Sequence, residues 1–394
     1  MVWQYEGKRD TQLTRHLLLP PGPETVDHSM IGTTRRVNPV TNMIEWSRLP
    51  SNQQGHQEQK ESIIYRLDPV REAGRLIFQI GTSDPDRAVA AARLVAGDVA
   101  GIDVNAGCPK PFSTSGGMGA ALLRTPDKLC AILDALVREI PPAFDIGISV
   151  KIRLLETPAE TEALVRRLVA TGITALTIHC RTTPMRKRER AIRAQLRMVA
   201  AVCHEAGVAC LMNGDVEDRD ASVGLVAEYG VDGAMIATAA EKNPSCFRAR
   251  ADGGLAPWDE VAERFLAYAL EVENKMPNTK YLLAQLVPGK RLEYRDVAKC
   301  KTYVQLCEVL GHAHLMAAAR AADERLELTP DKKKPKPPRE ANSSALAAGG
   351  QMAKARAAVA SQARKSISER GVASATHEPQ PQPAAQPVAQ PVAA

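Results

Sequence analysis

The feature that most constrains this chain is a regular alternation, from residue 75 onward, of short apolar runs with helical segments. Most helical segments have Asp or Thr near the start and Gly near the end, as helix caps require. The six apolar runs are LIFQIG (76–81), AGIDVNAG (100–107), IGISVKIR (146–153), ALTIHCR (175–181), ACLMNGD (209–215) and GAMIATA (233–239). Repeated β–α units predict a parallel sheet with right-handed crossovers.

The apolar runs favour a closed (β/α) barrel, because strands that are buried on both faces are apolar almost throughout. From the pattern alone, a doubly wound open sheet is the alternative. Composition agrees with a helix-covered parallel sheet: 44% of the 394 residues are hydrophobic but only 4% are aromatic. The core is therefore expected to consist mainly of Leu, Val, Ile and Ala.

Cysteine usage and hydropathy bear on the compartment. The eight cysteines are scattered, without a C-x-x-C pair or zinc spacing, and no segment resembles a signal peptide or reaches the roughly 18 apolar residues of a membrane span. We therefore expect reduced thiols, no metal, no membrane and a cytoplasmic protein, with the nucleus as an alternative. The formal charge of +6 permits a polyanionic partner without requiring one.

Polar residues stand where the apolar runs finish, and in (β/α) barrels the chemistry lies at the carboxyl ends of the strands. Lys, His, Gln and Arg are harder to attribute to ordinary turns than Asp, Ser or Gly. The candidates in chain order are Gln79, Asn105, Cys108, Lys151, Arg153, His179, Arg181, Asn213, Gly214, Asp215, Ala237 and Thr238.

Their chemistry suits a flavin and a reducible heterocycle. Cys108, held between Gly107 and Pro109, could donate a proton to a carbon that has just accepted hydride. Lys151 could stabilise the negative charge of a reduced flavin. The alternatives are a core cysteine, a solvated lysine and a glycine cluster at 116–119 that marks only a loop.

The run HCRTTPMRKRERAIR (179–193) follows a predicted strand and is strongly basic. It is interpreted equally as a solvated face or as a nucleic-acid contact. The tail contains KKKPKPPR (332–339), with the same two interpretations and a nuclear signal as a third.

At this point the residues resemble a known family. GIDVNAGCPKPFSTSGGMGAALL (101–123) is similar to the signature of the tRNA-dihydrouridine synthases. The resemblance covers about residues 23–315 and looks closest to the eukaryotic, fungal-like branch that acts on the D-loop uridine at position twenty. Further segments in the family's order are FQIGTSDPDRAVAAARLV, VKIR, IHCRT, MNGDV and ATAAEKNPSCF.

The resemblance implies an FMN-dependent oxidoreductase that uses NADPH or NADH and passes hydride to uracil C6, with Cys108 as the acid that protonates C5. The flavin-contacting positions that it implies are Gln79, Lys151 and His179, and those near the FMN phosphate are Asn213, Gly214, Asp215, Ala237 and Thr238. The substrate contacts that we expect are Asn105, Lys110, Arg153 and Arg181.

The family's first strand, with its Pro-Met motif, and the helix after it have no counterpart in residues 1–22. We therefore expect a TIM (β/α)8-type barrel over 23–244 that lacks one strand and one helix. A helical tRNA-binding domain is expected over 245–327 and a disordered tail over 328–394.

The function hypothesis is a monomeric enzyme that reduces a tRNA uridine. One alternative is a catalytically impaired tRNA-binding protein with an incomplete flavin site. The other is a flavin barrel that reduces a free pyrimidine.

Overall fold

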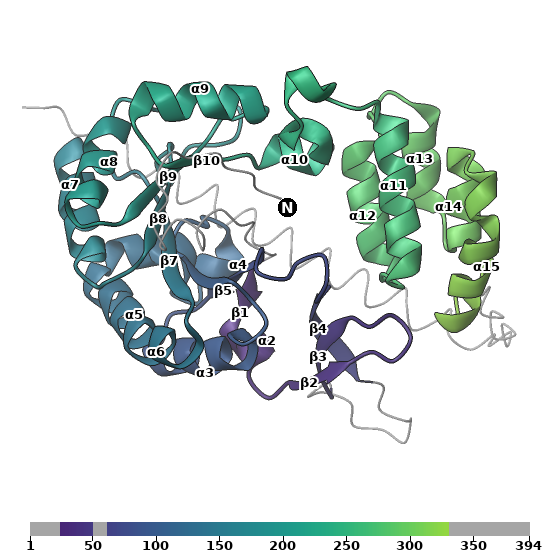
Figure 1. Cartoon of the computed structure of the whole chain (residues 1–394), viewed down its shortest axis with the longest axis horizontal. Coiled ribbons are helices and arrows are strands. Elements are labelled where there is room, and N and C mark those ends of the chain that lie inside the picture. Colours follow the sequence, from purple (N-terminus) through teal and green to yellow (C-terminus); the bar gives the residue numbers. More distant parts are fainter. Residues whose placement is uncertain (1–23, 50–60, 331–394) are drawn as a thin grey trace, which may run out of the picture. The chain divides into compact units, whose positions relative to one another are not determined.

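The computed structural model describes residues 24–49 and 61–330. Their main feature is a parallel sheet of seven strands, in which each strand is hydrogen-bonded to the next strand of the same sheet (Figure 1). The strands in sheet order are β1 (Thr25–Val26), β5 (Ile77–Gly81), β6 (Gly101–Asn105), β7 (Gly147–Arg153), β8 (Ala175–His179), β9 (Ala209–Asn213) and β10 (Gly233–Met235). All six apolar runs thus contain a strand, as predicted.

The strand order decides between the two predicted architectures. A doubly wound sheet reverses its order at a switch point, whereas a barrel adds each strand next to the one before it. Here β5 to β10 follow one another without a reversal. The order confirms barrel-type winding and excludes the doubly wound alternative.

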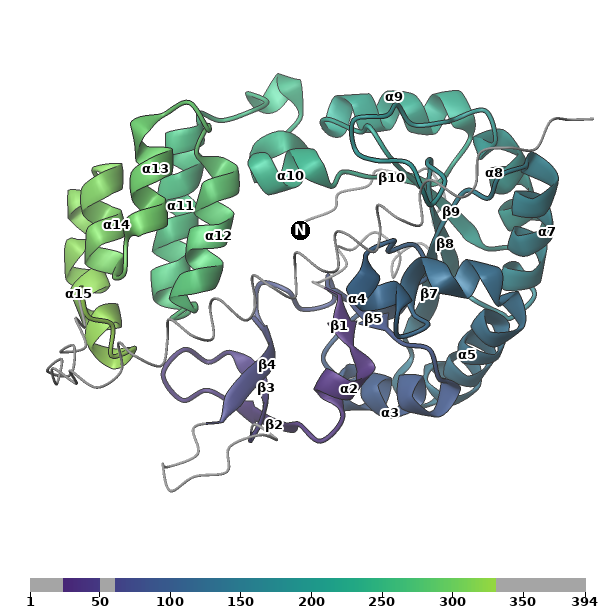
Figure 2. The same cartoon turned by 180° about the vertical axis from the view of Figure 1, so that it is seen from behind.

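Helices follow the strands and cover the outer side of the sheet (Figures 1 and 2). They are α3 (Pro85–Val95), α5 (Pro126–Glu139), α7 (Pro158–Val169), α8 (Leu196–Glu205) and α9 (Arg219–Tyr229). The Asp and Thr residues expected at helix starts act as caps: the side chain of Asp84 accepts from Arg87 N, and Thr157 forms a capping box with Glu160.

The barrel core lies between these helices and the sheet. Helix α5 buries Leu129, Ile132, Leu133 and Leu136, which recur at the spacing of one helical face. Strand β6 is buried along its whole length. Each of the four α5 side chains stabilises the fold by about 1.5–3 kcal/mol relative to the same side chain exposed to water.

The helical segment RERAIRAQLRMVAAVCHEAG (188–207), which the alternation predicts after the fourth apolar run, is shorter in the structure than its pattern indicates. The basic residues lie in an irregular segment, and α8 begins only at Leu196. Its buried face consists of Leu196, Val199, Ala200 and Cys203. The charged residues before Leu196 have no such face, so they are left as a loop beyond β8.

A three-stranded antiparallel sheet precedes the β–α units and was not predicted. It consists of β2 (Thr34–Val37), β3 (Ile44–Arg48) and β4 (Ser62–Leu67), paired in that order. Its strands mix charged and apolar residues, so they show neither the continuous apolar run of a buried strand nor the regular alternation of a half-buried one. The sequence therefore did not indicate this sheet.

The chain after residue 245 is helical, as predicted. Its helices are α11 (Trp258–Glu271), α12 (Met276–Leu286), α13 (Leu292–Lys299), α14 (Tyr303–Leu310) and α15 (Met316–Arg325), preceded by the short α10 (Thr238–Lys242). They have a hydrophobic core of their own, centred on Leu266, Leu283 and Leu306. Helix α14 begins where Thr302 accepts from Gln305 N and ends at Gly311, with φ +76°.

Two expectations fall on residues outside the described ranges. These are the unmatched segment 1–22 and nearly all of the tail 328–394, which contains KKKPKPPR. Within the described residues, no helix is both long and apolar enough to traverse a bilayer.

Candidate active site

Cys108 lies on a turn directly after β6, and the side chain of Asn105 holds that turn. The Asn105 Oδ1 atom accepts from Gly107 N at 2.9 Å and from Cys108 N at 3.0 Å. Ala106 N donates to Lys151 O on the neighbouring strand at 2.8 Å. Because an Asx turn of this kind replaces a backbone turn, the position of the Cys108 backbone is well defined.

The glycine cluster packs against this turn. Gly119 has φ +58°, and a Cβ atom there would lie 2.5 Å from Cys108 O and 2.4 Å from Ser113 Oγ. Ala120 N donates to Cys108 O at 2.9 Å. Gly119 is therefore required by close approach as well as by its backbone angle. The cluster therefore does more than mark a loop, because Gly119 packs against the turn that carries Cys108.

A lysine on β7 faces the same region. Lys151 pairs in register with Asn105, and its Nζ atom has no hydrogen-bond or ion-pair partner among the described residues. Burial lowers the pKa of Lys151 to about 8, and the nearby Arg153 lowers it too, whereas Asp103 and Cys108 act to raise it. The site thus holds an unpaired cation that would gain from an anionic neighbour.

Arg153 and Arg181 were predicted as substrate contacts, and both side chains hold loops. Arg153 Nε donates to Gly107 O at 2.8 Å, and Nη1 donates to Thr182 O at 2.9 Å. Arg181 Nε donates to Glu189 O at 2.7 Å, and Nη2 pairs with Asp215. Both residues are buried, so the observed contacts favour a positioning role.

His179, at the end of β8, is surrounded by cations. Its Nε2 atom lies 3.2 Å from Arg181 Nη1. Burial lowers the pKa of His179 to about 3, and Lys151, Arg153 and Arg181 act in the same direction. The ring is therefore neutral at physiological pH and can only donate through one nitrogen and accept through the other.

Gln79 is fixed by a carboxylate that the sequence analysis did not single out. Gln79 Nε2 donates to Asp103 Oδ2 at 2.8 Å, and Ser149 Oγ donates to Asp103 Oδ1 at 2.7 Å. Burial raises the pKa of Asp103. Alternation in β6 could have suggested Asp103, because it points the same way as Asn105, two residues later.

Glu24 is a second residue that the sequence analysis missed. It lies just before β1, and its Oε1 atom is buried without a partner among the described residues. Burial raises the pKa of Glu24, against the effects of Asn105, Lys110 and Lys151. The exposed Lys110 is thus close enough to act on the same group.

The predicted phosphate-binding residues follow β9 and β10. Asn213 Nδ2 donates to Met235 O at 2.9 Å, which ties the two strand ends together. Gly214 has φ +121°, and a Cβ atom there would lie 3.4 Å from His179 Cδ2. Ala237 precedes α10, and Thr238, its first residue, is exposed.

The side chain of Asp215 is directed to the basic loop. Its carboxylate pairs with Arg181 and accepts from Ala191 N at 2.7 Å. Burial acts to raise the pKa of Asp215, but these hydrogen bonds outweigh it and hold the pKa below its ordinary range. The whole set of predicted site residues remains a prediction as to ligand and role.

Among the described residues no group of three or more His, Cys, Asp or Glu side chains could hold a metal ion. The strand ends instead bring together a thiol, an unpaired ammonium group, a neutral imidazole and a carboxylate-anchored amide. Fold and site together define a (β/α)-barrel protein whose charged and polar side chains gather at the carboxyl ends of its strands.

Residues 18–324 match the model of the dihydrouridine synthase (Dus) family. The chain belongs to this family, whose domain is a TIM barrel. A tRNA-dihydrouridine(20) synthase [NAD(P)+] of Schizosaccharomyces pombe is 48% identical over 290 residues, 72% of this chain and 58% of that protein. The Saccharomyces cerevisiae protein of the same name is 40% identical over 295 residues, 73% of this chain and 75% of that protein.

More distant relatives match a smaller part. A tRNA-dihydrouridine synthase B of Yersinia pestis is 34% identical over 186 residues, 46% of this chain and 56% of that protein. The chain thus spans little more than half the length of several of its relatives.

Proposed function

We propose that this protein is an oxidoreductase that reduces a uridine of tRNA to dihydrouridine, at position twenty of the D-loop, with FMN and NADPH or NADH. The observation that carries the proposal is the placement of Cys108 on a turn held by Asn105 and Arg153, beside the unpaired Lys151. This arrangement occurs in a chain of the dihydrouridine synthase family.

The residues present fit FMN. Lys151 supplies an unpaired positive charge, and Gln79, anchored through its amide nitrogen, keeps its carbonyl oxygen for a donor such as an imide N–H. Gly214 leaves the side of His179 free of a side chain. When bound, FMN would supply hydride to C6 of the uracil ring.

The remaining steps belong to the protein's own side chains. Cys108 would hold the proton that C5 receives, and Asn105 and Arg153 would keep its turn in place while it does so. Lys151, protonated below a pH of about 8, would stabilise negative charge at the strand ends. His179 would act as a neutral donor.

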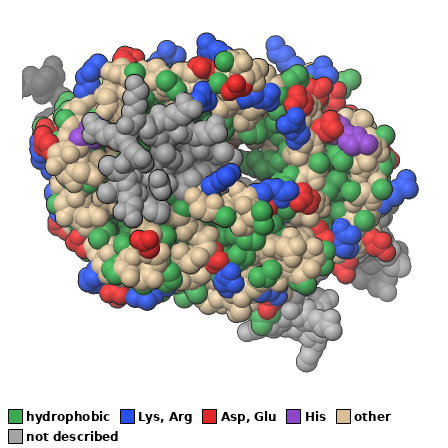
Figure 3. Space-filling view, viewed as in Figure 1, with side chains coloured by type: hydrophobic (Ala, Val, Ile, Leu, Met, Phe, Trp, Pro, Cys, Tyr) green, Lys and Arg blue, Asp and Glu red, His purple; other side chains and the backbone are tan. Residues whose placement is uncertain are grey.

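One surface, the basic loop, supports a tRNA partner. Residues 186–190 of the basic loop are exposed beside Arg181, which belongs to the site. On the face drawn in Figure 3, Lys and Arg side chains alternate with Asp and Glu around the rim. We therefore expect a local basic contact to position the RNA, with a target uridine turned out of its stack.

The test is a reaction of the purified chain with tRNA made by transcription and with NADPH, in which dihydrouridine is measured by mass spectrometry. The proposal expects flavin absorbance in the protein and dihydrouridine at one D-loop position. A colourless protein that binds tRNA without reducing it would support the non-catalytic alternative. Reduction of free uridine in preference to tRNA would support the free-pyrimidine alternative.

A further inference from the structure

The antiparallel sheet β2–β4, here called the bridging sheet, has one face on the barrel. Trp46 and Tyr65 are opposite each other on β3 and β4, with ring centroids 5.6 Å apart. Tyr65 packs edge-on against Phe78 of the barrel core, and Trp46 Nε1 donates to Leu94 O at 2.9 Å. Aromatic packing of this kind fixes the sheet to the barrel.

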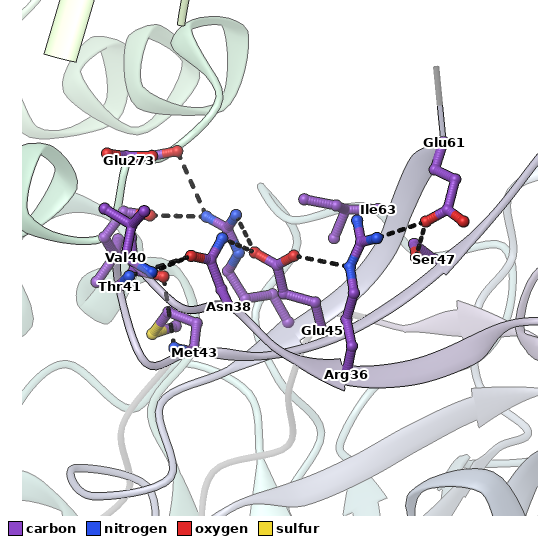
Figure 4. Close-up of polar contacts among 12 residues, drawn as sticks. Arg36, Asn38, Val40, Thr41, Met43, Glu45, Ser47, Glu61, Ile63 and Glu273 are labelled. Carbon is purple, nitrogen blue, oxygen red and sulfur yellow. Dashed lines mark hydrogen bonds and ion pairs between the residues drawn. The ribbon is translucent and has the colours of Figure 1, made fainter. Parts of the chain in front are cut away.

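The opposite face carries a row of charges, because successive residues of a strand point to opposite sides. Arg36, Glu45 and Arg66 are in register across the three strands. Glu45 is only 1% exposed, and its carboxylate binds Arg66 Nη2, accepts from Asn38 Nδ2 at 3.0 Å and lies 3.7 Å from Arg36 Nε. Figure 4 shows Arg36 and Asn38 directed at Glu45.

Arg66 connects this row to the C-terminal helices. Its Nη1 atom donates to Val272 O at 2.7 Å and to Glu273 O at 3.4 Å, beyond the end of α11. Asn274 N donates to Ala269 O at 2.8 Å, so α11 ends in a Schellman turn with Glu273 at φ +49°. Helix C-terminal carbonyls carry partial negative charge, which a guanidinium group complements.

Further polar contacts join the same two segments. Lys275 Nζ donates to Ile63 O at 3.0 Å. Arg71 Nη2 donates to both oxygens of Glu271, at 2.8 and 3.0 Å, and its guanidinium lies 5.0 Å from the centre of the Tyr268 ring. The end of α11 is thus held at several points along residues 63–71.

We propose that the bridging sheet fixes the helical region α11–α15 relative to the barrel, and that Arg66 is a positioning residue for a substrate that contacts both. The proposal rests on the proposed function, because tRNA is large enough to reach the strand ends and the helices together. A ligand that binds two linked surfaces loses affinity when their geometry is not maintained. A small substrate that binds only at the barrel would not depend on the position of the helices.

The experiment compares Arg66→Met, the control Arg35→Met and the double variant Glu45→Gln/Arg66→Met. Arg35 lies on β2 next to Arg36, but it pairs with Asp98 on the barrel side, at 2.8 and 2.7 Å. Three quantities are measured for each variant. These are the KM for tRNA, the rate of flavin reduction by NADPH without tRNA, and the melting temperature.

Arg66→Met is expected to raise the KM for tRNA by about tenfold and to leave flavin reduction unchanged. Arg35→Met should change neither the KM for tRNA nor the rate of flavin reduction. The double variant should recover the melting temperature that Arg66→Met loses, because it removes the charge of a buried carboxylate that has lost its hydrogen-bonded cation, yet it should keep the raised KM.

A KM for tRNA in the Arg66→Met protein equal to that of the wild type would overturn the positioning role. So would a double variant that recovers both melting temperature and KM, since the effect would then be one of stability alone. Filter binding of tRNA to the same variants separates this proposal from the proposed function. It reports docking even if the wild-type protein forms no dihydrouridine.

Discussion

At the scale of single residues, the candidate site works through supporting contacts. Cys108 is held by Asn105, and its turn is held again by Arg153 through Gly107 O. Gln79 is oriented by the buried Asp103. A mechanism that named only the thiol would leave out the groups that place it.

Cys108→Ala is expected to bind FMN as the wild type does and to lose at least about 100-fold in dihydrouridine formation, because a positioned general acid contributes roughly that factor. Flavin titration and a single-turnover assay measure the two effects. Cys130→Ala is the control, since Cys130 lies on α5, away from the strand ends. Normal turnover by Cys108→Ala would contradict the acid role.

Lys151 predicts a pH dependence of anion binding. Its pKa is lowered to about 8 from the ordinary value of 10.5, so its charge is lost as the pH rises through that range. FMN affinity should therefore fall above a pH of about 8, and Lys151→Met should remove this pH dependence.

The stability of the protein should change with pH in the opposite direction. Between a pH of about 8 and 10.5 the unfolded chain binds more protons at Lys151 than the folded chain does, so the free energy of unfolding rises with pH in this range. Chemical denaturation at several pH values tests this expectation.

At the scale of elements, the loop between β6 and α5 is built around the cysteine turn. Gly119 and Ala120 contact Cys108 directly, and Ser113 Oγ is buried against the same glycine. The loop therefore cannot move without moving the thiol.

Gly119→Ala is expected to destabilise the protein by more than about 1 kcal/mol, since it adds a strained φ to an overlap with backbone. It should also lower turnover. Gly224→Ala, within α9, meets no atom within 4 Å and should instead stabilise by about 0.5–1 kcal/mol. Thermal melts of both variants make the comparison. Equal effects would show that Gly119 is not a packing requirement.

At the scale of the whole molecule, the described residues contain two hydrophobic cores and a sheet that contacts both regions. The barrel core includes Trp46 and Phe78, and the second core lies within the C-terminal helices. The polar contacts of Arg66 and Arg71 connect them. We expect a substrate that needs both regions to depend on these contacts, whereas each region has a hydrophobic core of its own.

The basic loop predicts a salt-dependent contribution to tRNA binding. Replacing Arg188 and Arg190 together with Ala should weaken tRNA binding and reduce the slope of log affinity against log salt by about one for each phosphate that the loop no longer neutralises. Arg138→Ala is the control, because Arg138 is exposed on α5 and paired with Glu139. An unchanged slope in the double variant would show that the basic loop is a solvated face that does not contact tRNA.

The β–α repeat, the helical C-terminal region and the family could all be predicted from the amino-acid sequence, because helical spacing, caps and short motifs are local properties. The sequence also indicated Cys108, Lys151 and His179 through their places at strand ends. The contact between Asp103 and Gln79, the place of Glu24 beside the site and the bridging sheet became visible only in the folded structure. The folded structure alone also showed the low pKa of His179 and Lys151. The reason is physical: burial, register and charge proximity arise between residues far apart in the chain, and no local pattern records them.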